Sequence, residues 1–150
     1  MKLVIQRCLE ASVKVDGKLV SSIDKGLLIL LGVSVEDAQE DVDWLVNKVA
    51  HMRIFNDENG VMNKSILDCG FPAIVVSQFT LQASTKKGHR PSYIKAAKAE
   101  QAIPLYERFV SELEAVLNQE VGTGVFGADM KVALINDGPI TIVIDSKLRS

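Results

Sequence analysis

Hydrophobic and polar positions along the first part of the chain predict three strands. Residues 2–15 alternate well enough for one long strand with a buried face. Asp16-Gly17 is a hairpin signal, and residues 18–23 form the expected return strand. The unbroken apolar run at 27–33 is typical of a central strand that is buried on both faces.

Apolar residues recur at helical spacing in two later segments. The first predicted helix is capped by Ser34 and runs to about Met52, with acidic residues in its first turn. The second is expected to carry Pro104 in its first turn, and its apolar stripe continues to Leu117. Two main helices therefore follow the first strands.

Further β-rich stretches complete the predicted order of elements. The run at 73–81 enters a polar loop, whereas 131–135 and 141–145 are expected as two strands joined by a turn. The order β-β-β-α-β-α-β-β indicates a single α+β domain over residues 1–150, with mixed, mostly antiparallel strands.

The expected turn between the last two strands has an unusual proline. Asn136, Asp137 and Gly138 tolerate the left-handed backbone of a tight turn. Pro139 removes a backbone donor where the next strand should begin. Only about 5–6% of X-Pro bonds are cis, so the residues by themselves favour a trans Gly138–Pro139 bond.

Composition and charge are ordinary for a globular protein, with 47% hydrophobic residues, 24% charged residues and a formal net charge of -2. A nucleic-acid partner would therefore have to be held by a local basic patch. No apolar stretch approaches the ~20 residues of a membrane span, and Arg7 and Glu10 interrupt the N-terminal apolar segment. Two cysteines make no disulfide framework. We expect a cytoplasmic protein without a membrane or DNA partner.

Metal and cofactor chemistry has little support. His51 and His89 are the only histidines, and neither has a Cys or His at zinc-ligand spacing. A histidine-based triad stays open, although no carboxylate lies near His89 in sequence. The Gly-rich segment 122–127 lacks the Lys-Ser/Thr of a phosphate loop. We therefore expect no metal and no cofactor.

A basic window is more informative. No Asp or Glu occurs from Cys69 to Ala99, and this window contains five lysines and arginines, namely Lys86, Lys87, Arg90, Lys95 and Lys98. A solvated loop and helix face is one interpretation; a phosphate-binding rim is the other. The second gains weight because the polar segment Ser77–Leu81, "SQFTL", lies in the same window at a strand end.

The segments Ser77–Leu81 and Asn136–Thr141 together closely resemble the paired motifs of the D-aminoacyl-tRNA deacylases, and the resemblance extends over the whole chain. One departure is Ile140, where that family has Val or Phe. The resemblance implies an α+β fold with a barrel-like core, a homodimer, and hydrolysis of the ester between a D-amino acid and the 3′-terminal adenosine of tRNA. Glycine mischarged on tRNA, such as tRNA(Ala), is an implied second substrate. The family's Gly-Pro bond is cis and enters the active site of the other subunit.

Roles for individual residues follow from this resemblance together with their positions. The catalytic segment comprises Ser77, Gln78, Phe79 and Thr80; the chirality filter comprises Gly138 and Pro139; supporting residues are Arg7, Asn136 and Thr141; the adenosine pocket contains Phe79, Phe126 and Met130; contacts to tRNA phosphates come from Lys86, Lys87 and Arg90.

The preferred mechanism uses the backbone N–H groups around Phe79 and Thr80 as an oxyanion hole. In it, the terminal ribose 2′-OH helps to activate water. Thr80 as a nucleophile stays an alternative, although no His or Lys lies near it in sequence to activate it. Two other functions also stay open: a non-catalytic RNA-binding dimer and a general hydrolase of small esters.

Overall fold

The structure, a computed structural model, describes residues 1–150 and contains one six-stranded sheet and one small two-stranded sheet. The strands are β1 (Lys2–Val15), β2 (Lys18–Ile23), β3 (Gly26–Gly32), β4 (Phe55–Asn56), β5 (Met62–Lys64), β6 (Ala73–Ser77), β7 (Gly122–Thr123) and β8 (Met130–Asp145). The helices are α1 (Gln39–His51), α2 (Ile66–Cys69), the 3-10 turn η1 (Phe79–Gln82) and α3 (Ala99–Leu117). None of the helices is both long and apolar enough to cross a membrane.

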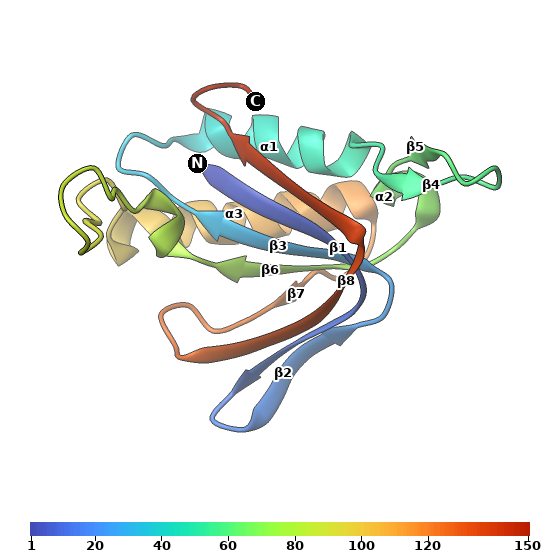
Figure 1. Ribbon diagram of the computed structural model, residues 1–150, viewed down its shortest axis with the longest axis horizontal. Coiled ribbons are helices and arrows are strands. Elements are labelled where there is room, and N and C mark those ends of the chain that lie inside the picture. The colour runs from blue at the N-terminus through green and yellow to red at the C-terminus, as the bar shows by residue number, and fades with distance from the viewer.

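Strand β1 pairs with three other strands of the large sheet. Its first half pairs with β3 and its second half with β2, while β8 runs antiparallel to both halves. The strands β3, β6 and β7 are parallel neighbours. The sheet curls into a nearly closed barrel (Figure 1), so that the hydroxyl of Ser21 in β2 donates to the carbonyl of Thr123 in β7 at 2.8 Å. The predicted α+β class with mixed, mostly antiparallel strands is confirmed.

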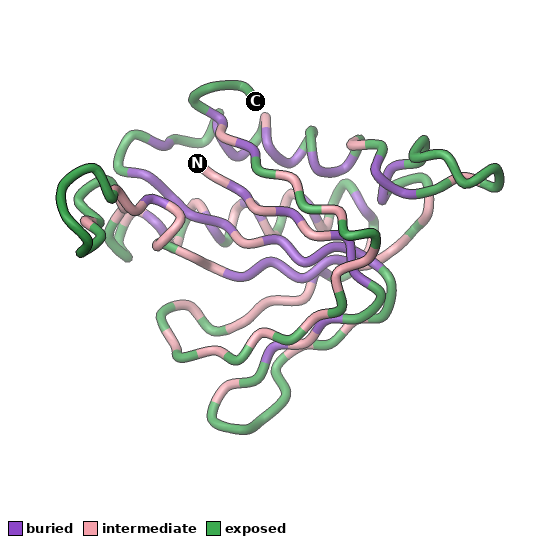
Figure 2. The backbone as a smooth tube through the Cα atoms, viewed as in Figure 1, coloured by how far each residue is buried: buried purple, intermediate pink, exposed green.

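The main core lies where α1 and α3 cover one face of the sheet. A cluster of 24 buried residues joins these helices to β1, β3 and β6, whereas a second cluster of only six lies within the barrel-like half. Figure 2 shows the same contrast, because β3 and β6 are mostly buried while β2 is largely exposed. The predicted central strand at 27–33 is therefore confirmed as a buried strand, with six of its seven residues buried.

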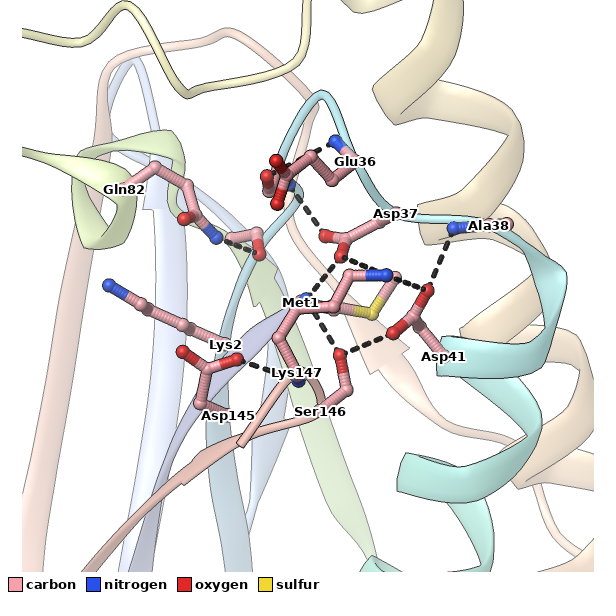
Figure 3. A network of polar contacts seen from close by, with 12 residues as sticks. Met1, Lys2, Glu36, Asp37, Ala38, Asp41, Gln82, Asp145, Ser146 and Lys147 are labelled. Carbon is pink, nitrogen blue, oxygen red and sulfur yellow. Dashed lines mark hydrogen bonds and ion pairs between the residues drawn. The ribbon is translucent and has the colours of Figure 1, made fainter. Parts of the chain in front are cut away.

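A buried polar network ties the N-terminus to the C-terminal segment and to α1 (Figure 3). The Met1 ammonium group donates to Asp37 Oδ1 at 2.5 Å and to Ser146 Oγ at 2.8 Å. The Ser146 hydroxyl donates to Asp41 Oδ1 at 2.6 Å, and Lys147 Nζ donates to Asp41 Oδ2 at 3.0 Å. Each buried charge in this network thus has an opposite charge and hydrogen bonds.

This network explains why α1 begins later than predicted. Ser34 does not cap the helix, because residues 34–37 form a separate turn before it: the Ser34 N–H donates to Asp37 Oδ2 at 2.6 Å, and the Ser34 hydroxyl accepts from the Glu36 N–H at 3.2 Å. The N-cap is Ala38 instead, whose N–H donates to Asp41 Oδ2 at 2.9 Å. The buried pair of Asp37 with the N-terminus holds residues 34–37 out of the helix.

Helix α3 begins earlier than predicted. It starts at Ala99, so Pro104 is its sixth residue and lies beyond the first turn. The early turn is stabilised because Ala102 is buried in the main core and the Gln101 amide donates to three carbonyl groups in segment 34–37. These tertiary contacts outweigh the backbone hydrogen bond that Pro104 removes.

The expected turn near Pro139 does not reverse the chain. Strand β8 is continuous from Met130 to Asp145, and its two halves pair with the two halves of β1. The pairing is irregular between Gln6 and Glu10, opposite the segment 136–141. The turn residues therefore form a bulge in one long strand, because β1 continues as the partner on both sides of it.

Candidate active site

A pocket of about 250 Å³ lies where β6 ends and brings together five residues singled out in the sequence. Its lining is mostly apolar and includes Ser77, Gln78, Phe79, Phe126 and Met130. The first three come from the end of β6 and the start of η1, whereas the last two come from the loop before β8 and from its first residue. Segments about fifty residues apart in sequence thus form one site.

The turn after β6 is held against β3. The Gln78 N–H donates to the Leu31 carbonyl at 2.7 Å, and the Gln82 amide donates to the Gly32 carbonyl at 2.8 Å. A Cβ at Gly32 would lie 2.7 Å from the Gln78 carbonyl oxygen and 2.9 Å from the Leu81 Cβ. Only glycine therefore permits this close approach.

The first turn of η1 leaves two backbone donors free. Leu81 N–H donates to the Gln78 carbonyl and Ala83 N–H to the Thr80 carbonyl, but the N–H groups of Phe79 and Thr80 have no acceptor in the protein. Free donors are expected at the start of a helical turn. They are adjacent: Phe79 lines the pocket, and Thr80 follows it directly in η1.

The Thr80 hydroxyl is engaged by a neighbouring side chain. It accepts a hydrogen bond from the Gln78 side-chain amide, and it has no other protein partner. No histidine or lysine contacts it. An amide donor does not remove a proton, so Thr80 has no base for activation as a nucleophile.

Aromatic rings frame the pocket. Phe126 packs edge-on against Tyr106 at 6.0 Å between ring centroids, and the Tyr106 hydroxyl donates to the Val75 carbonyl at 2.7 Å. Burial raises the pKa of Tyr106 to about 12, although a backbone hydrogen bond at Gly124 opposes this rise. Tyr106 therefore stays neutral, and its ring holds the side chain of Phe126 in place at the wall of the pocket. It was not singled out in the sequence, where it is one of several apolar positions of the helix.

The predicted phosphate-binding residues lie on an exposed loop that follows η1. Lys86, Lys87 and Arg90 are exposed and form no ion pair within the chain. The base of the loop is closed by a reciprocal pair of 2.8 Å backbone hydrogen bonds between Ser84 and Ser92. These cations are therefore free to meet an anionic ligand.

The bulge of β8 carries the other predicted motif. The Gly138–Pro139 bond is cis, as the resemblance implied, and Gly138 has a φ of +118°. Both residues are exposed. Beneath them, the buried Arg7 side chain donates to the Ile54 carbonyl at 2.8 Å and places Nε 3.1 Å from Asp137 Oδ2. The Arg7 contact with Asp137 is an ion pair rather than a directed hydrogen bond.

The predicted supporting residues all lie at this bulge. The Asn136 amide donates to the Arg7 carbonyl at 2.9 Å and to the Ile140 carbonyl at 3.0 Å, so it closes the bulge across its base. The Thr141 hydroxyl donates to Asn136 Oδ1 at 3.3 Å. Arg7, Asn136 and Thr141 thus hold the exposed Gly138–Pro139 segment in place.

The pocket and the bulge lie at opposite ends of β3. Leu31 pairs with Ser77 beside the pocket, whereas Gly26 pairs with Cys8, which also pairs with Asn136 at the bulge. Gly26 and Leu31 are five positions apart in an extended strand, which is roughly 17 Å at about 3.3 Å per residue. Figure 1 shows the bend of β8 at the opposite side from the turn after β6. One chain therefore does not bring the two motifs into one site.

Comparisons with known proteins agree with this architecture. A family model described as D-Tyr-tRNA(Tyr) deacylase matches residues 4–145. A D-aminoacyl-tRNA deacylase of Flavobacterium psychrophilum is 63% identical over 147 residues, which cover 98% of both chains. A D-aminoacyl-tRNA deacylase of Bacteroides thetaiotaomicron is 60% identical over the same length and coverage.

Two solved structures share the fold. One, a c-Myc DNA unwinding element binding protein, has a TM-score of 0.92 and 40% identity, covering 97% of this chain and 98% of that one. Another, described as a probable eukaryotic D-amino acid tRNA deacylase, has a TM-score of 0.83 at 16% identity, covering 95% and 97%, and supports the fold alone. With the family model matched over residues 4–145 and relatives this similar over nearly their whole length, the chain belongs to the D-Tyr-tRNA(Tyr) deacylase family, a family of hydrolases.

Proposed function

We propose that the protein hydrolyses the ester that joins a D-amino acid to the 3′-terminal adenosine of tRNA, in the pocket at the end of β6. The observation that carries the proposal is the pairing of two free backbone donors, at Phe79 and Thr80, with an apolar pocket walled by Phe79 and Phe126. The aromatic walls suit a nucleoside, and the donors suit the acyl group attached to it. Because its substrate is aminoacyl-tRNA, the protein would act in the cytoplasm.

In the proposed reaction the chain stabilises charge rather than supplying a nucleophile. The oxygen of a water molecule attacks the ester carbonyl carbon, and the N–H groups of Phe79 and Thr80 donate to the carbonyl oxygen as it becomes negative. The ribose 2′-OH assists in removing the proton from water. The ester C–O bond then breaks, and the 3′-oxygen of the adenosine leaves with a proton. The Thr80 hydroxyl, bonded to the Gln78 amide, helps to hold this turn in place.

Chirality would be read by a second copy of the chain. The exposed Gly138–Pro139 segment lies roughly 17 Å from the pocket of its own chain, by about 3.3 Å per strand residue. A partner's copy would present backbone carbonyl groups to the α-amino group and occupy the space of an L side chain. Such a filter ignores the identity of the side chain and admits glycine. Glycine on a tRNA, such as tRNA(Ala), is therefore a proposed second substrate.

The free edge of β8 supports a homodimer. This strand of sixteen residues has β1 as its only strand partner, so most backbone groups along its other edge are unpaired. Apolar side chains also face outward along it, since Val143 is 64% exposed and Ile135 is 49% exposed. A long edge with outward apolar residues is typical of a surface that a partner covers.

The test compares D-Tyr-tRNA and L-Tyr-tRNA as substrates for the wild-type protein and for a Gly138→Ala/Pro139→Ala variant. We expect the wild type to release only D-tyrosine and the variant to lose this discrimination. Gly17→Ala is the matched control, because Gly17 also has a positive φ but lies in the exposed β1–β2 turn. Thermal unfolding of each variant checks that it is folded.

Each other outcome points to a different function. Binding of tRNA without release of either amino acid would favour a non-catalytic RNA-binding dimer. Cleavage of simple esters without dependence on the tRNA would favour a general esterase. Unchanged discrimination in the folded double variant would remove Gly138 and Pro139 from the filter.

A further inference from the structure

A pair of exposed aromatic rings extends beyond the pocket. Phe79 is 55% exposed and Tyr93 is 40% exposed, with ring centroids 5.1 Å apart and planes at 71°. Phe79 lines the pocket, whereas Tyr93 does not. The Tyr93 hydroxyl has no hydrogen-bond partner in the chain, so the edge-on contact with Phe79 positions this ring without any polar contact.

The backbone on both sides of Tyr93 is anchored. Before it, Ser92 exchanges two 2.8 Å hydrogen bonds with Ser84. After it, the Ala96 N–H donates to the Tyr93 carbonyl at 3.0 Å, and the Ala97 N–H donates to the Val33 carbonyl at 2.9 Å, at the end of β3. The ring is therefore held beside Phe79 before any ligand arrives, which reduces the ordering cost of binding.

The charge around these rings suits a nucleic-acid strand. Tyr93 lies within the segment from Cys69 to Ala99 that has no acidic residue, a few positions from Lys86, Lys87 and Arg90. Aromatic rings combined with unpaired cations are the usual means of binding single-stranded RNA, since bases stack on rings while phosphates meet cations.

The size of the pocket determines which nucleotide of a bound strand would lie beside Tyr93. At about 250 Å³, it is at the small end of ligand sites and suits one nucleoside. The next nucleotide of a bound strand must therefore lie outside the mouth of the pocket. We propose that Tyr93 stacks on the base of the nucleotide that precedes the terminal adenosine. This inference rests on the proposed function.

The test measures binding and hydrolysis separately. Calorimetry compares adenosine with the dinucleotide CpA as ligands, and kinetics compare D-tyrosyl esters of adenosine, of CpA and of tRNA. Replacing Tyr93 with Leu should weaken binding of CpA and raise the KM of the CpA and tRNA esters about ten-fold, the scale of one lost base stack. The effect on adenosine and its ester should be much smaller, and kcat should change less than KM.

Two further variants separate stacking from a structural role. Tyr93→Phe keeps the ring and should retain the wild-type preference for CpA. Ile94→Ala changes an adjacent, 87% exposed apolar residue without a ring, and should leave binding and hydrolysis unchanged. An equal loss of affinity for adenosine and for CpA in Tyr93→Leu would overturn the proposal. A changed preference between D- and L-aminoacyl esters would also overturn it, because Tyr93 would then act beside the partner's Gly138–Pro139 segment.

The binding measurements also allow the role of Tyr93 to be tested separately from the proposed hydrolysis. If the wild type binds CpA more tightly than adenosine but hydrolyses no ester, the proposed hydrolysis fails while the stacking role stands. If the wild type hydrolyses the esters but binds CpA no more tightly than adenosine, the stacking role fails alone.

Discussion

Polar groups are arranged in opposite ways in two regions of this molecule. Around Met1, Asp37 and Ser146, polar atoms are buried and engaged by ion pairs and hydrogen bonds (Figure 3). At the end of β6, two backbone N–H groups lack acceptors and the ring of Phe79 is more than half exposed. The lysines of the following loop form no ion pairs.

The contrast separates groups that hold the fold from groups that can meet a ligand. A buried charge is costly unless it is paired, so the Met1 network must be complete before the chain is stable. An exposed donor or ring interacts with water until a ligand displaces it, so it costs the fold little. Substitutions in the first region should therefore change the free energy of unfolding, and those in the second should change substrate binding.

The largest effect is expected from Asp37→Asn. The Asp37 side chain is fully buried and pairs with the Met1 ammonium at 2.5 Å, so neutralising it leaves a buried cation without its partner. Breaking a buried ion pair costs about 3–5 kcal/mol. Urea unfolding should show a loss of that size, while kcat and KM of the folded protein should be close to those of the wild type.

An exposed ion pair provides the matched control. Asp43 lies 3.3 Å from Arg108, and its side chain is 53% exposed. Asp43→Asn should change the free energy of unfolding by at most about 1 kcal/mol. A similar loss in both variants, or a fall in kcat in Asp37→Asn without loss of stability, would break the distinction between the two regions.

A smaller effect is expected from acidification. Burial raises the pKa of Asp41, but hydrogen bonds from Ser146, from the Ala38 N–H and from Lys147 outweigh it and lower the pKa from 3.8 to about 2. Because the pKa is lower in the folded state, Asp41 stabilises the fold above pH 4 and this contribution is lost as the pH falls from about 4 to about 2. The loss should be about 2 kcal/mol, since one pKa unit is about 1.4 kcal/mol.

Urea midpoints measured across this pH range check the expectation. The Asp41→Asn variant should be less stable than the wild type near neutral pH, and the difference should shrink toward pH 2. A constant difference at all pH values would show that Asp41 does not carry this part of the acid sensitivity.

The elements of the fold that depend on neighbours in sequence were predictable. Alternation at 2–15 and the apolar run at 27–33 correspond to β1 and β3, because burial sets the local pattern of side chains. The start of α1 was not predictable, since it depends on Asp37 meeting a terminus 36 residues away. The continuity of β8 was missed for a similar reason, because β1 alone determines it.

The candidate site shows the same division. Ser77, Gln78 and Phe79 stand out as a polar and aromatic segment at a strand end, and the structure places them with Phe126 and Met130 in one pocket. The separation of the pocket from the Gly138–Pro139 segment has no local signal, since it follows from the pairing of β1, β3 and β8. Tyr93 was missed because its contact with Phe79 crosses a loop of more than ten residues.

The smallest effect on stability is expected from the exposed cations of the loop after η1. Lys86→Gln/Lys87→Gln should leave the free energy of unfolding within about 0.5 kcal/mol of the wild type, because both side chains are exposed and unpaired. The double variant should gain less affinity for tRNA at low salt than the wild type does, and its KM should rise several-fold. Each phosphate contact contributes about 0.7–0.9 to the slope of log affinity against log salt, so the slope should become shallower by roughly 1.4–1.8.

The matched control, Lys14→Gln/Lys18→Gln, removes two exposed lysines from the β1–β2 hairpin and should keep the wild-type slope. Equal changes in the two double variants would mean that tRNA affinity depends on the total charge of the protein rather than on this loop, and the ligand-binding region would then not be confined to the end of β6.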